Sequence, residues 1–154
     1  MANKNQENIK QQLSLMIQNL NNGKLEEVKK IGMALLKEHK NNPAIYNILG
    51  IVAYNEKNVE EAIYHFKMAL QLNENNFDAY NNLGKIYKEK GSVNESVESY
   101  KKAISIKPDF IQGHINLGLV LLERGDLRQG LESIYGVEGV IKFNDKNCKV
   151  LNKL

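Results

Sequence analysis

The chain of 154 residues contains few side chains that could support catalysis or bind a metal ion. Its histidines, His39, His65 and His114, lie too far apart in sequence to form a metal-binding motif. The single cysteine, Cys148, has no second cysteine with which to form a disulfide within the chain. The glycines do not form a phosphate-binding loop, and no motif arranges a nucleophile beside a base. The sequence therefore predicts no catalytic residue, no metal site and no cofactor.

The composition is that of a globular protein, with 42% hydrophobic and 25% charged residues. The net charge is +3, but the basic residues are mixed with acidic residues along the chain. Nucleic-acid binding usually requires basic residues clustered on one face, so we expect no nucleic-acid partner. No apolar run is long enough for a signal peptide or a membrane-spanning helix. We therefore expect a cytoplasmic protein that does not bind a membrane.

Residues of similar type recur at a spacing of 34 along most of the chain. The first half of each unit has a planar side chain followed by leucine and glycine: Tyr46, Leu49 and Gly50, then Tyr80, Leu83 and Gly84, then His114, Leu117 and Gly118. The second half has a small residue followed four positions later by a bulky one: Ala62 and Phe66, Ser96 and Tyr100, Gly130 and Ile134. Each half has the apolar spacing of a helix, so each unit is predicted to be a pair of helices.

Turn and capping signals separate the predicted helices. Turns within the pairs are expected near four positions that are also 34 apart, namely Gly23, Lys57, Gly91 and Gly125. The helices that follow three of these turns open on a capping-box pattern, formed by Asn58 with Glu61, Ser92 with Glu95, and Asp126 with Gln129. Asn42 and Pro43 open a further helix with proline at its first position. We expect seven or eight helices and no sheet of consequence.

These residues resemble the tetratricopeptide-repeat family, whose pattern of 34 residues combines an aromatic-leucine-glycine first helix with a small-aromatic second helix. The resemblance implies an all-α fold, a right-handed superhelical array of antiparallel helix hairpins. We expect a flexible N-terminus (1–7), a divergent helix pair (8–41) and three repeats that continue the same domain. The repeats would span 42–75, 76–109 and 110–138, and a capping segment and tail would follow (139–154).

The resemblance also implies that the first helices line a concave groove for a peptide or a partner helix. The residues placed toward this groove are Asn47, Ile51, Tyr54, Asp78, Asn81, Asn82, Lys85, Lys88, Gln112, Ile115, Asn116, Leu119 and Leu122. Asn82 and Asn116 resemble two rungs of the asparagine ladder with which certain transferases of N-acetylglucosamine grip a peptide backbone, although Ile48 breaks the ladder. The alternative is that the chain is simply rich in asparagine. Tyr54 either contacts the peptide or packs between helices.

Two function classes remain open. The first is a non-catalytic protein–protein interaction module. The second is the repeat portion of a glycosyltransferase or sulfotransferase system without its catalytic domain. In either case we expect a monomer or a weak homo-oligomer. An apolar patch of Val137, Val140, Ile141 and Phe143 either caps the last repeat or forms an open contact for a second copy or a partner.

Overall fold

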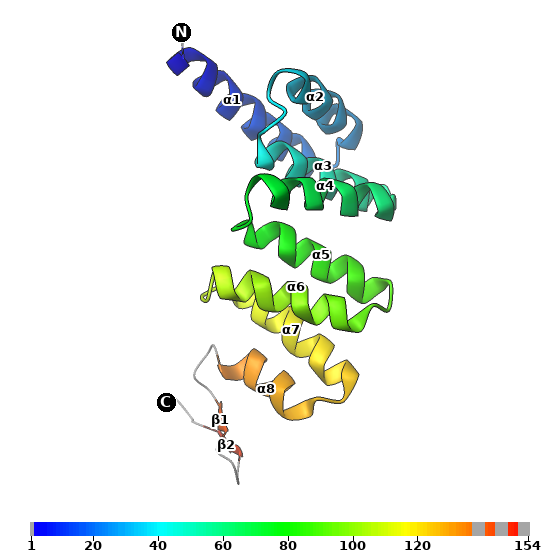
Figure 1. Cartoon of the computed structure of the whole chain (residues 1–154), viewed down its shortest axis with the longest axis vertical. Helices are drawn as coiled ribbons and strands as arrows, with labels where there is room; N and C mark the ends of the chain where they lie inside the picture. Colours follow the sequence, from blue (N-terminus) through cyan, green and yellow to red (C-terminus); the bar gives the residue numbers. More distant parts are fainter. Residues whose placement is uncertain (1, 137–140, 144–147, 151–154) are drawn as a thin grey trace. The chain divides into compact units, whose positions relative to one another are not determined.

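The computed structural model describes residues 2–136, 141–143 and 148–150, and in these residues eight α helices are followed by a short β hairpin (Figure 1). The helices are α1 (Ala2–Asn21), α2 (Leu25–Glu38), α3 (Pro43–Asn55), α4 (Val59–Leu72), α5 (Phe77–Glu89), α6 (Val93–Ile106), α7 (Ile111–Arg124) and α8 (Leu127–Gly136). The strands are β1 (Ile141–Phe143) and β2 (Cys148–Val150). The contacts divide the chain into two compact units, Met1–Ala79 and Tyr80–Leu154.

The turn within each helix pair contains one residue in the left-handed backbone region. Gly23, Gly91 and Gly125 have φ angles of 71°, 76° and 94°, and Lys57 has a φ of 64°. A side chain makes this conformation unfavourable, so glycine is the usual choice. Lys57 has the same backbone conformation although it has a side chain, which makes this conformation less favourable. The positions at which the sequence predicted turns are thus the positions at which the backbone reverses.

The predicted helix caps are confirmed at two sites and fail at a third. The side chain of Asn42 accepts a hydrogen bond from Ala44 N at 3.0 Å, ahead of Pro43 at the start of α3. Asn58 Oδ1 accepts from the backbone of Glu61 at 3.4 Å, and Asn58 Nδ2 donates to Glu61 Oε2 at 2.6 Å. The prediction was wrong for Ser92, whose side chain makes no capping hydrogen bond; nothing in the structure explains this.

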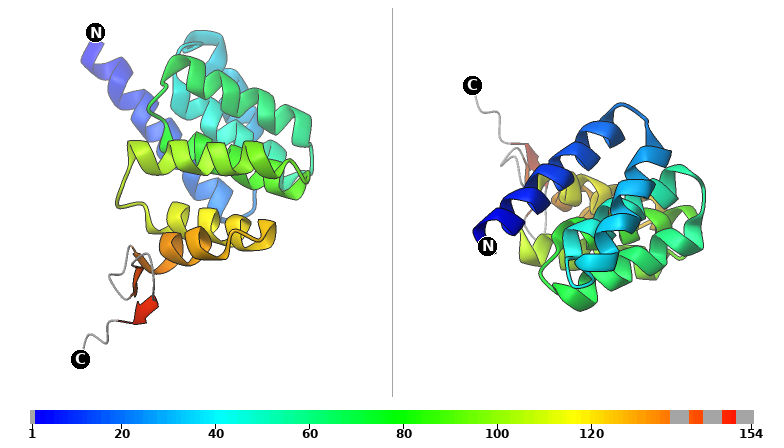
Figure 2. Two further views of the ribbon diagram at one scale, coloured as in Figure 1. Left: turned by 60° about the horizontal axis from the view of Figure 1, so that its bottom comes forward. Right: turned by 90° about the horizontal axis from the view of Figure 1, so that it is seen from above.

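In the first unit, α1, α2 and α3 enclose one hydrophobic cluster. Met16, Val28, Ile48 and Val52 are buried at its centre, and the partly buried Leu13, Leu20, Leu25, Ile31 and Leu35 pack around them. The divergent N-terminal pair is therefore attached to α3 by the burial of apolar side chains, each worth roughly 1.5–3 kcal/mol. Figure 2 shows α1 and α2 in blue from two further directions.

In the second unit, the core is formed by α6 and α7 and extends to α5. Val97 and Tyr100 from α6 pack with Leu117, Val120 and Leu121 from α7. One serine hydroxyl joins the two helices of each pair: Ser96 Oγ on α6 donates to Gly84 O on α5 at 2.7 Å, and Ser133 Oγ on α8 donates to His114 O on α7 at 2.9 Å. The buried bond of Ser96 satisfies polar groups from which water is excluded.

Two features of the C-terminal region are not apparent from the sequence. Gly130 and Gly136 both lie within α8, and Gly130 is buried against Leu122 of α7. Beyond α8, the short strand β1 pairs with β2 in antiparallel register, with Ile141 opposite Val150. Three-residue strands are too short to show an alternating pattern in sequence. Val137 and Val140 lie outside the described residues.

Candidate functional site

In the second unit, side-chain amides on α5 and α7 form a chain of hydrogen bonds. Asn116 Nδ2 donates to Asn81 Oδ1 at 2.9 Å, and Gln112 Nε2 donates to Asn116 Oδ1 at 2.9 Å. Gln112 is exposed, whereas Asn81 and Asn116 are half-buried. In this row of three amides each hydrogen bond is donated in the same direction, from Gln112 to Asn116 and from Asn116 to Asn81. The amide NH₂ group of Asn81 is therefore at one end of the row, and the amide oxygen of Gln112 is at the other. No further partner of these two end groups occurs among the described residues.

A second polar contact joins the same two helices seven residues further along each of them. Lys88 Nζ lies 2.7 Å from Glu123 Oε1. The pairs Asn81–Asn116 and Lys88–Glu123 therefore have the same sequence separation and lie about 10 Å apart along the helix axes. Leu119 lies between them in sequence on α7 and exposes 43% of its surface. We call this surface the α5–α7 face. It has the amides of Asn81, Gln112 and Asn116 at one end, the Lys88–Glu123 ion pair at the other and the exposed Leu119 between them.

The ladder of Asn82 and Asn116 stays a prediction. Asn116 bonds to Asn81, and Asn82 lies half-buried beside it on α5. The exposed Lys85 also lies on α5. Leu122, which the sequence placed toward the groove, instead packs against Gly130 of α8. The placement of Leu122 was therefore wrong, because in this pair the residue faces the neighbouring second helix.

The remaining predicted groove residues belong to α3 in the first unit. Asn47, Ile51 and Tyr54 are all half-buried. The Oδ1 atom of Asn47 is shielded from solvent and has no hydrogen-bond partner among the described residues. Ile51 and Tyr54 follow it at helical spacing on the same side of α3. This side of α3 is more apolar and more enclosed than the α5–α7 face.

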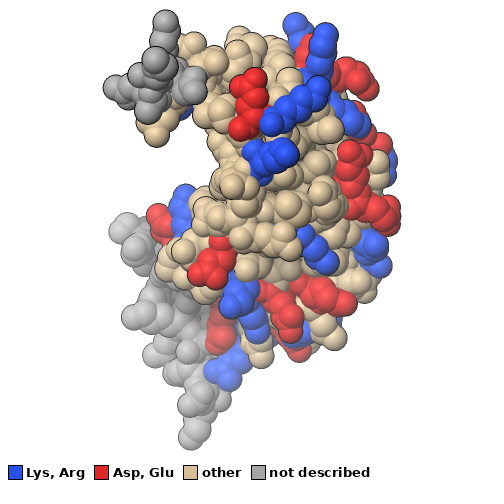
Figure 3. All heavy atoms as spheres, turned by 45° about the horizontal axis from the view of Figure 1, so that its top comes forward, with Lys and Arg blue, Asp and Glu red and all other residues tan. Residues whose placement is uncertain are grey.

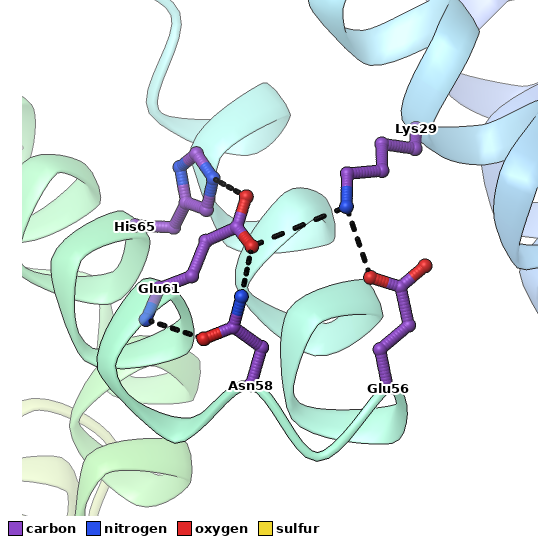
Figure 4. Close-up of polar contacts among 5 residues, drawn as sticks. All are labelled: Lys29, Glu56, Asn58, Glu61 and His65. Atoms are coloured by element: carbon purple, nitrogen blue, oxygen red, sulfur yellow. Dashed lines mark hydrogen bonds and ion pairs between the residues drawn. The ribbon is translucent and has the colours of Figure 1, made fainter.

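A separate polar cluster, which the sequence analysis did not find, joins three segments of the first unit (Figure 4). Lys29 Nζ on α2 lies 3.0 Å from Glu56 Oε2, just after α3, and 4.0 Å from Glu61 Oε2 on α4. The hydrogen bond from Lys29 to Glu56 is the main cause that raises the pKa of Lys29 above its usual value. Glu61 Oε2 also accepts a hydrogen bond from Asn58 Nδ2 at 2.6 Å, and Glu61 Oε1 lies 3.7 Å from His65 Nε2.

His65 is buried within this cluster, and its ring contacts the rings of Tyr46 and Tyr64. Burial lowers its pKa, and this effect outweighs the neighbouring Glu61 carboxylate, which raises it. The Nδ1 atom of His65 has no hydrogen-bond partner among the described residues. Burial therefore favours the neutral form of His65 in the folded chain. The cluster has the character of a structural contact between helices.

The charged surface is mixed in sign on the face that Figure 3 shows, where blue and red side chains alternate. Among the described residues, no group of three or more potential ligands could hold a metal ion. In the same part of the chain, no helix has the length and apolarity needed to cross a membrane. One surface hollow, with a volume of about 550 Å³, is lined by Tyr80, Ser99 and Lys102 and is open to solvent.

Comparisons with known proteins agree with the arrangement of helix pairs. The family model described as TPR repeat matches residues 53–91 and 84–125. The structure titled "Crystal structure of MamA" is 25% identical, with a TM-score of 0.76 over 86% of this chain and 77% of that one. A chain in the structure titled "Crystal structure of APC/C hetero-tetramer Cut9-Hcn1" is 22% identical, with a TM-score of 0.73 over 83% of this chain and 26% of that one.

A third similar structure is an enzyme, an O-GlcNAc transferase mutant from Thermobaculum terrenum. It is 22% identical, with a TM-score of 0.69 over 73% of this chain and 22% of that one. At this identity the similarity is one of fold. No curated protein sequence matches the chain.

Proposed function

We propose, on the basis that the chain belongs to the tetratricopeptide-repeat family, that it is a non-catalytic interaction module whose α5–α7 face binds an extended peptide segment of another protein. Its repeats are those of a protein-interaction scaffold. The observation that carries the proposal is the amide chain from Gln112 through Asn116 to Asn81. An amide side chain can both donate to and accept from a peptide backbone, whatever the sequence of that peptide.

The exposure and chemistry of the face support this assignment. Leu119 is an exposed large apolar residue next to the amides, and apolar contact supplies much of the affinity in peptide binding. The Asn82, Lys85 and Lys88 side chains border the amides along α5 and belong to the proposed site. On α3, the residues Asn47, Ile51 and Tyr54 form a second proposed contact, mainly apolar, for the same class of ligand.

A partner helix is the other form that the ligand could take. A helix satisfies its own backbone hydrogen bonds, so it would contact Leu119 but would have little use for the amide chain. The amides therefore favour an extended peptide. We also propose a cytoplasmic location and a monomer or weak homo-oligomer, which cell fractionation and analytical ultracentrifugation would test.

Selection of short random peptides on the purified full chain tests the proposal. The selected peptide is expected to lose about tenfold or more in affinity in the double variant Asn81→Ala/Asn116→Ala, since at least two hydrogen bonds are removed. Asn94→Ala, on α6, is the matched control and should bind as the wild type does. Failure to select any peptide, or equal binding by the double variant, would contradict the proposal.

A second candidate is that these repeats serve a glycosyltransferase or sulfotransferase system. The fold similarity to the O-GlcNAc transferase favours it, although the chain covers 22% of that enzyme. An assay that adds separately encoded transferase domains from the same genome to this chain would test it. A sugar or sulfate transferred to the selected peptide only when this chain is present would support this candidate.

A further inference from the structure

We propose that the open hollow beside Tyr80 binds an aromatic side chain of a partner polypeptide. The hollow has a volume of about 550 Å³ and is lined by residues of α5 and α6, namely Tyr80, Glu98, Ser99, Lys101, Lys102 and Ser105. We call it the Tyr80 hollow. It shares no residue with the α5–α7 face, so the inference goes beyond the proposed function.

The equivalent place in the preceding helix pair is filled by aromatic rings of the chain itself. The ring centroid of Tyr46 on α3 lies 6.0 Å from that of His65 on α4, and the ring of Tyr64 meets His65 edge-on at 5.3 Å. Tyr46 and His65 are both buried. Rings at these distances attract each other in addition to the gain from burial. In this pair, a tyrosine of the first helix is therefore covered by rings from the second helix.

The next repeat keeps the tyrosine and lacks the two rings. Thirty-four residues further along, the tyrosine recurs as Tyr80, whereas the two ring positions hold Glu98 and Ser99. Tyr80 is only half-buried, in contrast to the buried Tyr46. Both Glu98 and Ser99 line the Tyr80 hollow. The hollow thus lies beside the positions whose counterparts carry rings in the α3–α4 pair.

The polar groups of the Tyr80 hollow are compatible with an apolar ring. Ser99 Oγ donates to Glu95 O at 2.7 Å, and Ser105 Oγ donates to Lys102 O at 2.8 Å. Both hydroxyls are bonded to the backbone of their own helix, so they require no bond from a ligand. A ring beside Tyr80 would gain apolar burial and a ring–ring contact. The exposed Lys102 can also place its ammonium group over the face of such a ring.

The openness of the Tyr80 hollow indicates the source of the ring. Sites for free small molecules enclose most of the surface of their ligand. The Tyr80 hollow is open to solvent, so a free aromatic compound would leave much of its surface exposed. A ring on a polypeptide brings flanking residues that contact the rim as well, and aromatic side chains are common at the centre of protein interfaces. The rings beside Tyr46 are likewise held by a polypeptide.

The test uses nuclear magnetic resonance titrations of the isotope-labelled full chain with N-acetyl-tryptophan amide and with N-acetyl-leucine amide. The tryptophan probe should shift the ring signals of Tyr80 and the backbone signals of Ser99 and Lys102 saturably. It should bind at least about fivefold more tightly than the leucine probe. A short peptide with tryptophan between glycines should bind about threefold more tightly than the single amide, because its flanking peptide units contact the rim.

Two variants fill the Tyr80 hollow from the protein side. Glu98→Tyr/Ser99→His introduces the two rings of the α3–α4 pair and should lower the affinity for the tryptophan probes at least about tenfold. Asn94→His, which places a histidine elsewhere on α6, is the matched control and should bind as the wild type does. Circular dichroism reports whether the double variant is folded. Glu98→Tyr alone, at an exposed position, should lower the affinity about threefold and decides the test if the double variant unfolds.

Three outcomes would overturn the inference. The first is the absence of saturable shifts at Tyr80, and the second is equal affinity for the tryptophan and leucine probes. The third is unchanged binding by the variants that fill the hollow. Equal affinity for the tryptophan amide and the tryptophan peptide would indicate a site for free aromatic compounds and contradict the polypeptide ligand. None of these outcomes depends on the α5–α7 face, so failure here is distinguishable from failure of the proposed function.

Discussion

Gly118 on α7 and Gly130 on α8 face each other so closely that a methyl group on either would meet the backbone of the other. A Cβ atom on Gly118 would lie 2.7 Å from Gly130 O, and one on Gly130 would lie 2.9 Å from Gly118 O. In the two preceding repeats the equivalent glycines, Gly50 and Gly84, instead face the rings of Phe66 and Tyr100. The last pair has Ile134 in place of the ring, and its helix backbones approach each other directly.

This contact predicts that Gly118→Ala is destabilising, although alanine is the better helix former. The added methyl group would press on a backbone oxygen that cannot rotate away, which costs about 1–3 kcal/mol through overpacking. Urea unfolding followed by circular dichroism measures the effect. Lys101→Ala, at an exposed position on α6, is the control and should change stability by less than about 0.5 kcal/mol. A Gly118→Ala variant as stable as the wild type would show that the pair can separate at no cost.

At Lys57 we expect the opposite result, namely that substitution by glycine stabilises the protein. Its φ angle of 64° is unfavourable for a side chain, so Lys57→Gly should raise the free energy of unfolding by up to about 1 kcal/mol. The reverse change, Gly91→Lys at the equivalent turn with a φ of 76°, should lower it by a similar amount. Denaturant unfolding of both variants checks the pair. A stabilising Gly91→Lys would contradict the backbone argument.

His65 predicts a pH dependence of stability. Burial lowers its pKa, so between its folded and unfolded pKa values the unfolded chain binds more protons. Its contribution to stability is therefore complete above about pH 6.5 and is lost as the pH falls through the folded-state pKa. His65→Phe should reduce the loss of stability between about pH 7.5 and about pH 5.5. Equal pH dependence in the two proteins would exclude His65 as its source.

The C-terminal segment predicts an effect of truncation. If the segment 139–154 caps the last repeat, truncation after Glu138 should lower the thermal midpoint by several degrees, because buried apolar side chains are worth roughly 1.5–3 kcal/mol each. Truncation after Val150, which keeps β1 and β2, is the control. Unchanged stability with loss of self-association or of partner binding would instead indicate an open contact.

The helix pairs were predictable from sequence because each repeats the same apolar spacing and ends at the same turn position. The period of 34 places Gly91 and Gly125 at turns even without structural information. The β1–β2 hairpin was not predictable, because Ile141–Phe143 and Cys148–Val150 are too short to show a period of two. Gly130 holds the small-residue position of the last repeat, and the structure shows that it serves close packing against α7.

The candidate site was predicted as a set of residues but not as a set of contacts. Asn82 and Asn116 were predicted from their equivalent positions to grip a peptide, which stays a prediction. The hydrogen bond from Asn116 to Asn81 joins residues 35 apart, so a search at the repeat length of 34 did not find it. Lys88 and Glu123, which form an ion pair, are also 35 residues apart. Their opposite charges at this spacing could have indicated from the sequence which residues of α5 and α7 are in contact.

The proposed binding of a peptide to the amide face of α5 and α7 can be observed directly through the side-chain amide resonances of that face. Titration of the isotope-labelled full chain with the selected peptide, followed by nuclear magnetic resonance, should shift the side-chain NH₂ signals of Asn81, Asn116 and Gln112 together and saturably. Control signals from Asn94 on α6 and Asn19 on α1 should stay in place. Saturable shifts confined to residues of α4, α6 or α8, with the three amides unchanged, would contradict the claim.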